Sequence, residues 1–460
     1  MESKPQSRKS QPPLSKYSIP ENSYNVRNNN DNRIGKWLPP SHDSQLAWLR
    51  ALINHVDKSS QPLHPVLQEF AHLIETNAKV YMLVTSMLRQ VPEKKPYKDD
   101  PTGAPQIRDY RHLLQLLNHL LTTAPAWSDG SYRIGLIGLP INAVLDWSMG
   151  TSSGFAAFLD PDINGIFKKI LTAWGEFLKS SQSAAVLDDS DTGWFGETGL
   201  KDLTAAANVG GTKYPFEKMF VCDPGARFYG YKSWDDFFTR RFRDGIRPVA
   251  SPDDGNVIVN ACESTPYRIE RDVGAREQFW LKNQPYSVMD MLANDELAPN
   301  FVGGTVYQAF LSSLSYHRWH SPVSGKVVKR YIVDGTYYSE PLYEGVGNIK
   351  VHVDKAVETS GEMIAQAYIT AVATRGLIFI EADNPAIGLV AFIGVGMAEV
   401  STCDITVKEG DHLQKGDELG MFHFGGSTHC LLFRKGVNLT GFPELGGEEN
   451  MPVNSQLAVL

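Results

Sequence analysis

The sequence is poor in cysteine and has neither a long apolar run nor an excess of positive charge. Its four cysteines are widely scattered: Cys222, Cys262, Cys403 and Cys430. With no CxxC spacing, they indicate neither a disulfide framework nor a cysteine-based zinc site, and they fit a reducing compartment. A formal net charge of −8 gives no basis for nucleic-acid binding.

No apolar stretch approaches the length that spans a bilayer. The best candidate, Ile134 to Trp147, is too short and contains Pro140 and Asp146. The first residues also lack the apolar core of a signal peptide. We therefore expect a cytoplasmic protein without stable membrane insertion.

Residues 1–40 are rich in Ser, Pro, Asn and basic residues and contain few large apolar ones. Such a segment buries too little surface to offset its ordering entropy, so we expect a disordered tail. Its basic residues resemble a transit peptide, but its prolines and acidic residues argue against the amphipathic helix that such peptides need.

Between about residues 43 and 180, apolar residues recur at helical spacing. The pattern predicts four helices, around 46–56, 66–74, 113–121 and 163–178. Asp43 or Ser44 is the expected cap of the first helix, and Asp160 or Asp162 that of the last. We expect a helical extension domain over residues 41–210.

No metal site is expected. The four histidines of the predicted helical domain lack a paired ligand spacing: His55, His72, His112 and His119. Two further histidines, His317 and His320, have a spacing that suits metal binding, but no third ligand lies near them in the sequence.

After about residue 210, β-rich segments alternate with glycine-containing turns. Five strands are predicted, at 256–261, 305–310, 326–333, 377–381 and 388–395. We also expect a capped helix over 233–242, another helix near 287–294, and a hairpin-rich barrel or sandwich edge over 407–420. The predicted fold class is α+β: a helical extension followed by a mainly β domain over residues 211–460.

Three segments of the predicted β domain carry residues suited to chemistry. They are the acidic turn Pro252–Gly255, the segment Tyr316–Pro322 with its two histidines, and Gly425–Thr428. Read alone, the first is a common turn and the last is a strand that ends in a tight turn.

An aspartate, a histidine and a serine in this chain order are compatible with a catalytic triad, in which a base removes the serine proton. A conventional serine hydrolase is one candidate. Its nucleophile elbow, however, needs a glycine two residues after the serine, where His429 stands.

These segments together resemble the phosphatidylserine decarboxylase family, whose members are pyruvoyl-dependent and cleave themselves. The resemblance covers roughly residues 230–460 and follows five motifs in order: Trp234–Phe242 with Arg247-Pro248, Pro252–Gly255, Tyr316–His320, Gly410–Gly420 and Phe424–Thr428. The preceding helical segment is similar to the extension of the fungal L-tryptophan decarboxylase branch, through Gly154-Phe155, Phe167-Lys168-Lys169 and Trp174-Gly175. Other segments shared with that branch are Ala261–Ser264, Phe379–Asn384 and Gly420–Ser427.

The resemblance implies that Ser427 attacks the Gly426–Ser427 peptide carbonyl, activated by Asp254 and His320. Cleavage there would leave a covalent pyruvoyl cofactor in place of Ser427 and two fragments, one of them residues 427–460. The fragments would stay associated, because a strand of the barrel would be split without leaving it. That group would bind a substrate amine and delocalise the carbanion left by CO2 loss. His317 matches the family histidine that positions substrate or delivers a proton.

The chain departs from the family pattern in two places. Gly425 stands where Leu or Val is usual, as in the tryptophan decarboxylase branch. That branch can lack the aspartate of the PxDG turn, whereas this chain has Asp253 and Asp254.

We expect a decarboxylase of an aromatic L-amino acid such as tryptophan. The alternatives are a phosphatidylserine decarboxylase proper and an uncleaved, non-catalytic binding protein. Substrate-pocket residues are expected from the loop 334–348 and from the helical domain. A homodimer is a further expectation, since the family's β domain is often dimeric.

Overall fold

The computed structural model describes residues 42–59, 61–92, 97, 103, 105–127, 137–277, 286–340, 366–400, 402–424, 427–445, 447 and 449–460. The expected disordered tail lies outside the described residues. So do Gly425, Gly426 and the 341–348 part of the expected pocket loop.

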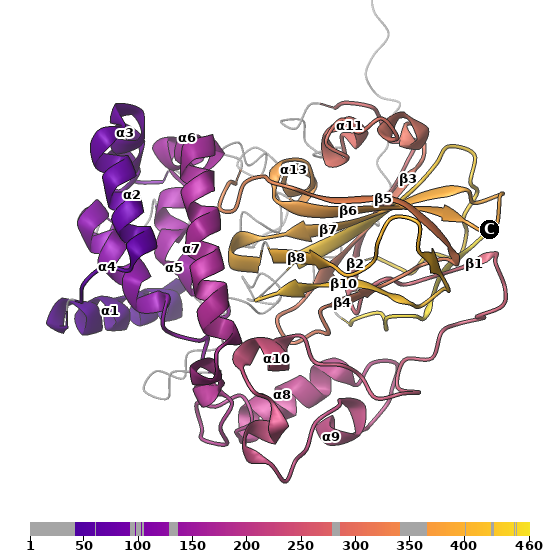
Figure 1. The fold of residues 1–460 in the computed structure, drawn as a ribbon, viewed down its shortest axis with the longest axis horizontal. Helices are drawn as coiled ribbons and strands as arrows, with labels where there is room; N and C mark the ends of the chain where they lie inside the picture. The colour runs from indigo at the N-terminus through magenta and orange to yellow at the C-terminus, as the bar shows by residue number, and fades with distance from the viewer. Residues whose placement is uncertain are drawn as a thin grey trace, which may run out of the picture.

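The N-terminal helices pack together on one side of the molecule (Figure 1). They are α1 (His42–Lys58), α2 (Pro65–Thr76), α3 (Ala78–Met87), α4 (Tyr110–Leu120), α5 (Pro140–Met149), α6 (Ser152–Leu159) and α7 (Pro161–Lys179). Helices α1, α2, α4 and α7 confirm the four predicted from periodicity. Their apolar stripes supply a core that includes Phe70, Leu117 and Trp174, each of them fully buried.

The structure decides which residues cap α1 and α7, where the sequence left two candidates for each helix. The Asp160 carboxylate accepts hydrogen bonds from the backbone N–H groups of Asp162 and Ile163, so Asp160 is the cap of α7. The expected caps of α1 were wrong, because α1 already begins at His42 and Asp43 lies in its first turn. A capping side chain must precede the helical residues whose N–H groups it accepts from.

The strands form three antiparallel sheets, which confirms the α+β fold class. The largest has the order β2 (Thr265–Arg271), β3 (Thr305–Leu311), β11 (Ser427–Phe433), β7 (Leu389–Gly396), β6 (Arg375–Ala382), β5 (Gly325–Val333) and β9 (His412–Leu413). A second has the order β4 (Arg318–His320), β10 (Glu418–His423) and β8 (Thr402–Ile405). The third pairs β1 (Val257–Val259) with β12 (Gln456–Val459). The five predicted strands correspond to β1, β3, β5, β6 and β7.

The segment 407–420 does not form the expected hairpin. Strand β9 pairs with β5, whereas β10 pairs with β4 and β8. The turns at Gly410 and Gly416, both with φ near +90°, therefore lead the chain into two different sheets instead of folding it back on itself.

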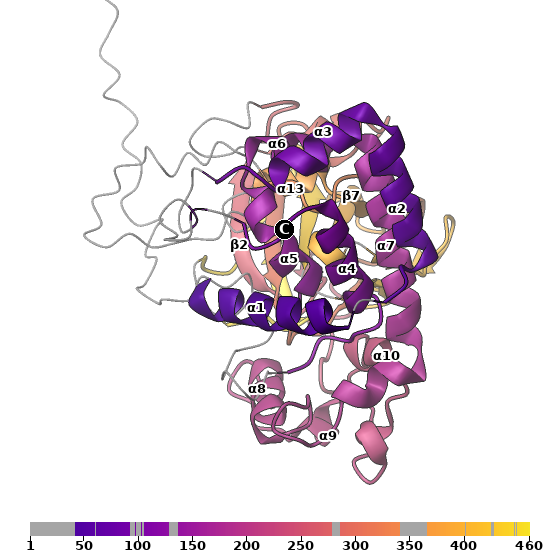
Figure 2. The same ribbon diagram turned by 90° about the vertical axis from the view of Figure 1, so that its left-hand side faces the viewer.

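Short elements complete the described chain. They are α8 (Glu197–Ala207), α9 (Phe216–Met219), α10 (Trp234–Phe238), α11 (Val288–Met291), α13 (Gln366–Val372), η2 (Ser181–Val186), η3 (Arg227–Gly230), η4 (Ala298–Phe301) and η6 (Ala398–Val400). Helix α10 is shorter than the predicted 233–242, because Phe242 leaves it to bridge Phe220. Helices α8, α9 and α10 lie together below the sheets (Figures 1 and 2). The domain boundary at residue 210 stays a prediction.

The N-terminal helices cover one end of the strands (Figure 2). The ring of Phe424 packs against Trp174 of α7, with 6.3 Å between ring centroids. The ring of Tyr338 packs against Phe167 of the same helix at 5.0 Å. Within the described ranges, no helix is long and apolar enough to cross a membrane.

Candidate active site

Ser427 is the first residue of β11, an interior strand of the large sheet that lies between β3 and β7. It pairs with Leu311 of β3 and with Gly396 of β7. Its side chain is fully buried, and its Oγ has no hydrogen-bond partner among the described residues. A buried hydroxyl without a partner forfeits a hydrogen bond that water would supply, so such a position calls for an explanation beyond packing.

The described strands on the two sides of the expected cleavage bond belong to different sheets, which corrects the expectation of one split strand. Strand β10 ends at His423 in the three-stranded sheet, and β11 begins at Ser427 in the seven-stranded sheet. The sequence could not distinguish one long strand from two, because apolar residues lie on both sides of Gly425 and Gly426.

His317 lies beside β10, the strand that leads to Ser427. Its backbone carbonyl accepts a hydrogen bond from the Phe422 N–H at 3.0 Å. Its ring is fully buried and stacks on Phe238 with 4.0 Å between centroids. Burial, assisted by the charge of Arg240, holds the pKa of His317 well below its ordinary value, so the imidazole is neutral.

His320 is half-buried and held at both ring nitrogens. Nδ1 lies 2.7 Å from the carbonyl oxygen of Gly416, and Nε2 lies 3.0 Å from the hydroxyl of Tyr316. A carbonyl only accepts, so Nδ1 carries the proton and the Nε2 lone pair accepts from Tyr316. Burial lowers the pKa of His320, which favours this neutral form.

Asp254 lies in an exposed turn, and none of its described hydrogen bonds reaches His320. Its carboxylate accepts from the backbone N–H of Asn256 at 2.9 Å. The two residues are connected indirectly: the Lys415 ammonium donates to the Asp254 carbonyl at 2.8 Å, and the adjacent Gly416 carbonyl holds His320. The described contacts thus place Asp254 and His320 on either side of one turn, without the direct bond of a serine-protease triad.

His423 is a candidate that no sequence signal singled out. Its Nδ1 lies 2.8 Å from a carboxylate oxygen of Asp235 in α10, and its Nε2 lies 3.4 Å from Asp404 of β8. Burial alone would lower its pKa, but the two carboxylates outweigh burial and raise it. A histidine whose cationic form is favoured by two carboxylates is therefore anchored at the end of β10, four residues before Ser427.

A polar network supports β11 directly after Ser427. Thr428 donates through its hydroxyl to the Ala309 carbonyl at 2.9 Å and accepts from the Gln308 amide at 3.0 Å. Tyr286 donates in turn to Gln308. These bonds fix the register and orientation of the strand that begins with the serine.

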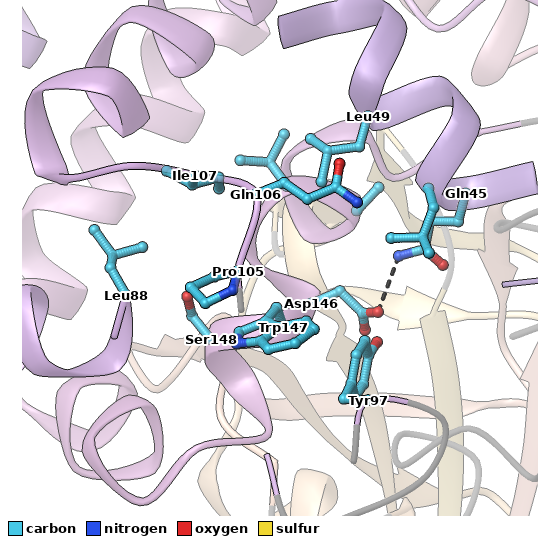
Figure 3. A pocket seen from close by; sticks show the side chains of 13 residues that line it. Gln45, Leu49, Leu88, Tyr97, Pro105, Gln106, Ile107, Asp146, Trp147 and Ser148 are labelled. Atoms are coloured by element: carbon cyan, nitrogen blue, oxygen red, sulfur yellow. Dashed lines mark hydrogen bonds between the residues drawn. The ribbon is translucent and has the colours of Figure 1, made fainter. Parts of the chain in front are cut away.

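The cavity shown in Figure 3 lies among the N-terminal helices. Leu49, Tyr97 and Trp147 line it, and Gln45 donates to Asp146 at its edge. None of its lining residues belongs to the motifs around Ser427. No group of three or more acidic, histidine or cysteine side chains in the described part of the chain is arranged to hold a metal ion.

Comparison with known proteins bears on both parts of the chain. Two family models, each described as phosphatidylserine decarboxylase, match residues 64–203 and 234–447. Decarboxylase iboD of Amanita muscaria is 44% identical over 335 residues, which cover 70% of this chain and 91% of that protein. The chain belongs to the phosphatidylserine decarboxylase family.

Other relatives extend the comparison in two directions. L-tryptophan decarboxylase of Psilocybe cubensis is 36% identical over 377 residues, 80% of each chain. Phosphatidylserine decarboxylase proenzyme 3 of Schizosaccharomyces pombe is 31% identical over 215 residues, 47% of this chain and 20% of that protein. The predicted family and fungal branch are confirmed, and the chain is a decarboxylase, that is, a carboxy-lyase.

Proposed function

We propose that the chain cleaves itself between Gly426 and Ser427 and then decarboxylates an aromatic L-amino acid such as tryptophan, with a covalent pyruvoyl group. The observation that carries this proposal is the buried Oγ of Ser427, which stands in the family's cleavage motif and has no hydrogen-bond partner among the described residues. The similarity to two L-tryptophan decarboxylases supports the choice of an amino acid as substrate.

The maturation step uses atoms of the chain and one water. Ser427 Oγ would attack the Gly426 carbonyl carbon, the peptide C–N bond would break, and an ester would replace it. β-Elimination of that ester would free the Gly426 carboxylate. Hydrolysis of the resulting enamine would consume one water, release ammonia and leave a pyruvoyl group at position 427.

His320 is the proposed base for this attack, with Asp254 on the far side of the turn. Its Nε2 lone pair is available for a proton because Nδ1 is already protonated against Gly416. In the described geometry Tyr316 donates to that lone pair, so the tyrosine would have to yield to Ser427. Asp254 would act through the Lys415–Gly416 turn that holds His320 in place.

The site has the character that a pyruvoyl group requires. Position 427 is fully buried and no described side chain competes for its side-chain atoms, so a small ketone fits without leaving a new unpaired donor. Once formed, the group supplies a carbonyl that binds a substrate amine and accepts the electron pair left by CO2 loss. His317, whose buried imidazole is neutral, is proposed to position the substrate through a hydrogen bond.

The two fragments should stay together after cleavage. The short fragment keeps β11 hydrogen-bonded between β3 and β7, and β12 paired with β1. A homodimer stays an untested prediction. The runner-up substrate is phosphatidylserine, which the matching family models and the Schizosaccharomyces pombe relative favour.

The test combines denaturing electrophoresis, intact mass and a substrate screen. Two fragments, with a pyruvoyl mass at the start of residues 427–460, would support the proposal. Amine release should follow from tryptophan, tyrosine or phenylalanine and not from phosphatidylserine. A single species at 51.1 kDa with an unmodified serine would favour the non-catalytic alternative.

A further inference from the structure

Three buried polar residues lie on neighbouring segments where the N-terminal helices contact the sheet domain. Glu399 Oε2, the hydroxyl of Tyr338 and both amide atoms of Asn142 have no hydrogen-bond partner among the described residues. The exposed fractions of these residues are 0%, 1% and 0%. Buried polar groups are nearly always paired, so three such groups in one place point to a missing partner.

The three side chains, here called the Glu399 cluster, are neighbours across the chain. Glu399 Oε1 accepts from the backbone N–H groups of Ile141 and Asn142 at the start of α5. Oε2 has no hydrogen-bond partner among the described residues. The backbone N–H of Ala398, which precedes Glu399, donates to the carbonyl of Tyr337, which precedes Tyr338, at 3.1 Å, so the segments that carry Glu399 and Tyr338 lie side by side.

The cluster lies within reach of Ser427. Strand β7 ends at Gly396, which pairs with Ser427, and Glu399 follows three residues later. Three residues extend at most about 11 Å, so that is the greatest separation of the Gly396 and Glu399 Cα atoms. Tyr338 comes from the loop expected to line the pocket, and Asn142 from the helical part.

The chemistry of the cluster suits an uncharged polar group. Burial raises the pKa of Glu399 to about 8, although the backbone N–H groups of Ile141, Asn142 and Glu399 itself lower it, so at neutral pH the carboxyl group is mostly protonated. The amide and the phenol each donate and accept. Phe158 and Phe167 pack against the Tyr338 ring and give the surroundings an aromatic character.

We propose that Asn142, Tyr338 and Glu399 form the polar end of the amino-acid pocket and select side chains that carry an uncharged N–H or O–H group on an aromatic ring. This inference rests on the proposed function and names its substrate class. An indole or phenol would pair with the cluster, whereas a benzyl side chain would leave its polar atoms unsatisfied. Sites built to bond such a group reject analogues that lack it.

The test uses the self-cleaved enzyme and kcat/KM for tryptophan, tyrosine and phenylalanine. In Tyr338→Phe and Glu399→Gln, we expect the better of the two polar substrates to lose about tenfold or more in kcat/KM relative to phenylalanine. Tyr307→Phe is the matched control, since Tyr307 also has a buried hydroxyl without a described partner but stacks on Phe442 of the C-terminal segment. That control should leave the substrate ratio unchanged.

Two results would overturn the inference and separate it from the proposed function. Equal changes for all three substrates, or none, in both cluster variants would mean that the cluster holds ordered water with no part in selection. If the wild-type enzyme decarboxylates no amino acid, the proposed function fails and this inference fails with it. Should Glu399→Gln remain uncut, Tyr338→Phe still decides the question, because it removes only one hydroxyl.

Discussion

The N-terminal helices and the large sheet differ in how far along the chain the partners of their polar groups lie. In the helices, side chains from the neighbouring residues cap the free N–H groups, as Asn77 does for α3, Asp109 for α4 and Asp160 for α7. In the large sheet, Ser427 Oγ and both ring nitrogens of His429 are buried without a partner in the described part of the chain.

The difference follows from how each part buries its residues. A helix cap and its acceptor are a few residues apart, so the sequence that forms the helix also supplies the partner. In the sheet, Ser427 is buried by β3 and β7, whose residues are far away in the chain. Among the described residues, unpartnered buried polar atoms also occur in the helical part, at Gln106 and Asn142. At Ser427, however, the burial is imposed by strands that are distant in the chain, and this is the site of the proposed chemistry.

The largest expected effect comes from removing the buried hydroxyl of Ser427. Ser427→Ala should abolish self-cleavage and decarboxylation altogether, because the attacking oxygen is lost. Denaturing electrophoresis should show one full-length chain.

Its matched control is Ser183→Ala in the helical part. Ser183 is equally buried, but its hydroxyl donates to the Leu178 carbonyl and accepts from the Trp234 N–H. We expect a loss of about 1–3 kcal/mol in unfolding free energy, with cleavage retained. Cleavage that survived in Ser427→Ala would contradict the proposed maturation.

The next effect concerns the ion pair that joins α10 to the end of β10. Asp235→Asn should lower the unfolding free energy by about 3 kcal/mol, since it leaves a mostly buried cationic His423 with only the more distant Asp404. Denaturant titration checks the value. His412→Gln, which breaks the exposed pair with Asp383, should change stability by less than about 1 kcal/mol.

The ion pair between His423 and Asp235 makes the stability of the protein depend on pH. The pKa of His423 is raised in the folded protein, so its stabilisation is complete below the ordinary histidine pKa and is lost as pH rises through the folded value. The pKa of Asp404 is lowered by three neighbouring groups: His423 of β10, Lys179 of α7 and Arg318 of β4. In Asp235→Asn, the unfolding free energy measured against pH should no longer show the contribution of the ion pair between His423 and Asp235. An unchanged profile would show that His423 is not the titrating group.

A smaller effect tests how the helices contact the segment before Ser427. A Cβ at Gly175 of α7 would lie 2.7 Å from the Phe424 ring, so Gly175→Ala should cost about 2 kcal/mol and slow self-cleavage. Gly165→Ala in the same helix meets nothing within 4 Å and should stabilise by about 0.5–1 kcal/mol. Thermal unfolding and a cleavage time course measure both. Equal behaviour of the two variants would argue against a role of the Phe424 contact.

Much of the architecture could be predicted from the sequence. Helices α2, α4 and α7 follow from apolar periodicity, and the five predicted strands appear with shifted ends, because these patterns depend on residues close together in the chain. The motifs from Trp234 to Thr428 were enough to predict the family. The hairpin at 407–420 was wrong, since glycine turns show where a chain bends and not which strand it meets.

The sequence by itself determined where helices and strands form, which serine stands in the cleavage motif and which family the chain joins. Only the tertiary structure decided that His423 faces Asp235 and that the Glu399 carboxyl group reaches the start of α5. It also decided that Asp254 and His320 lie on either side of the Lys415–Gly416 turn. The physical reason is distance along the chain: periodicity and capping act over a few residues, whereas these contacts join segments that meet only once the sheets and helices have packed.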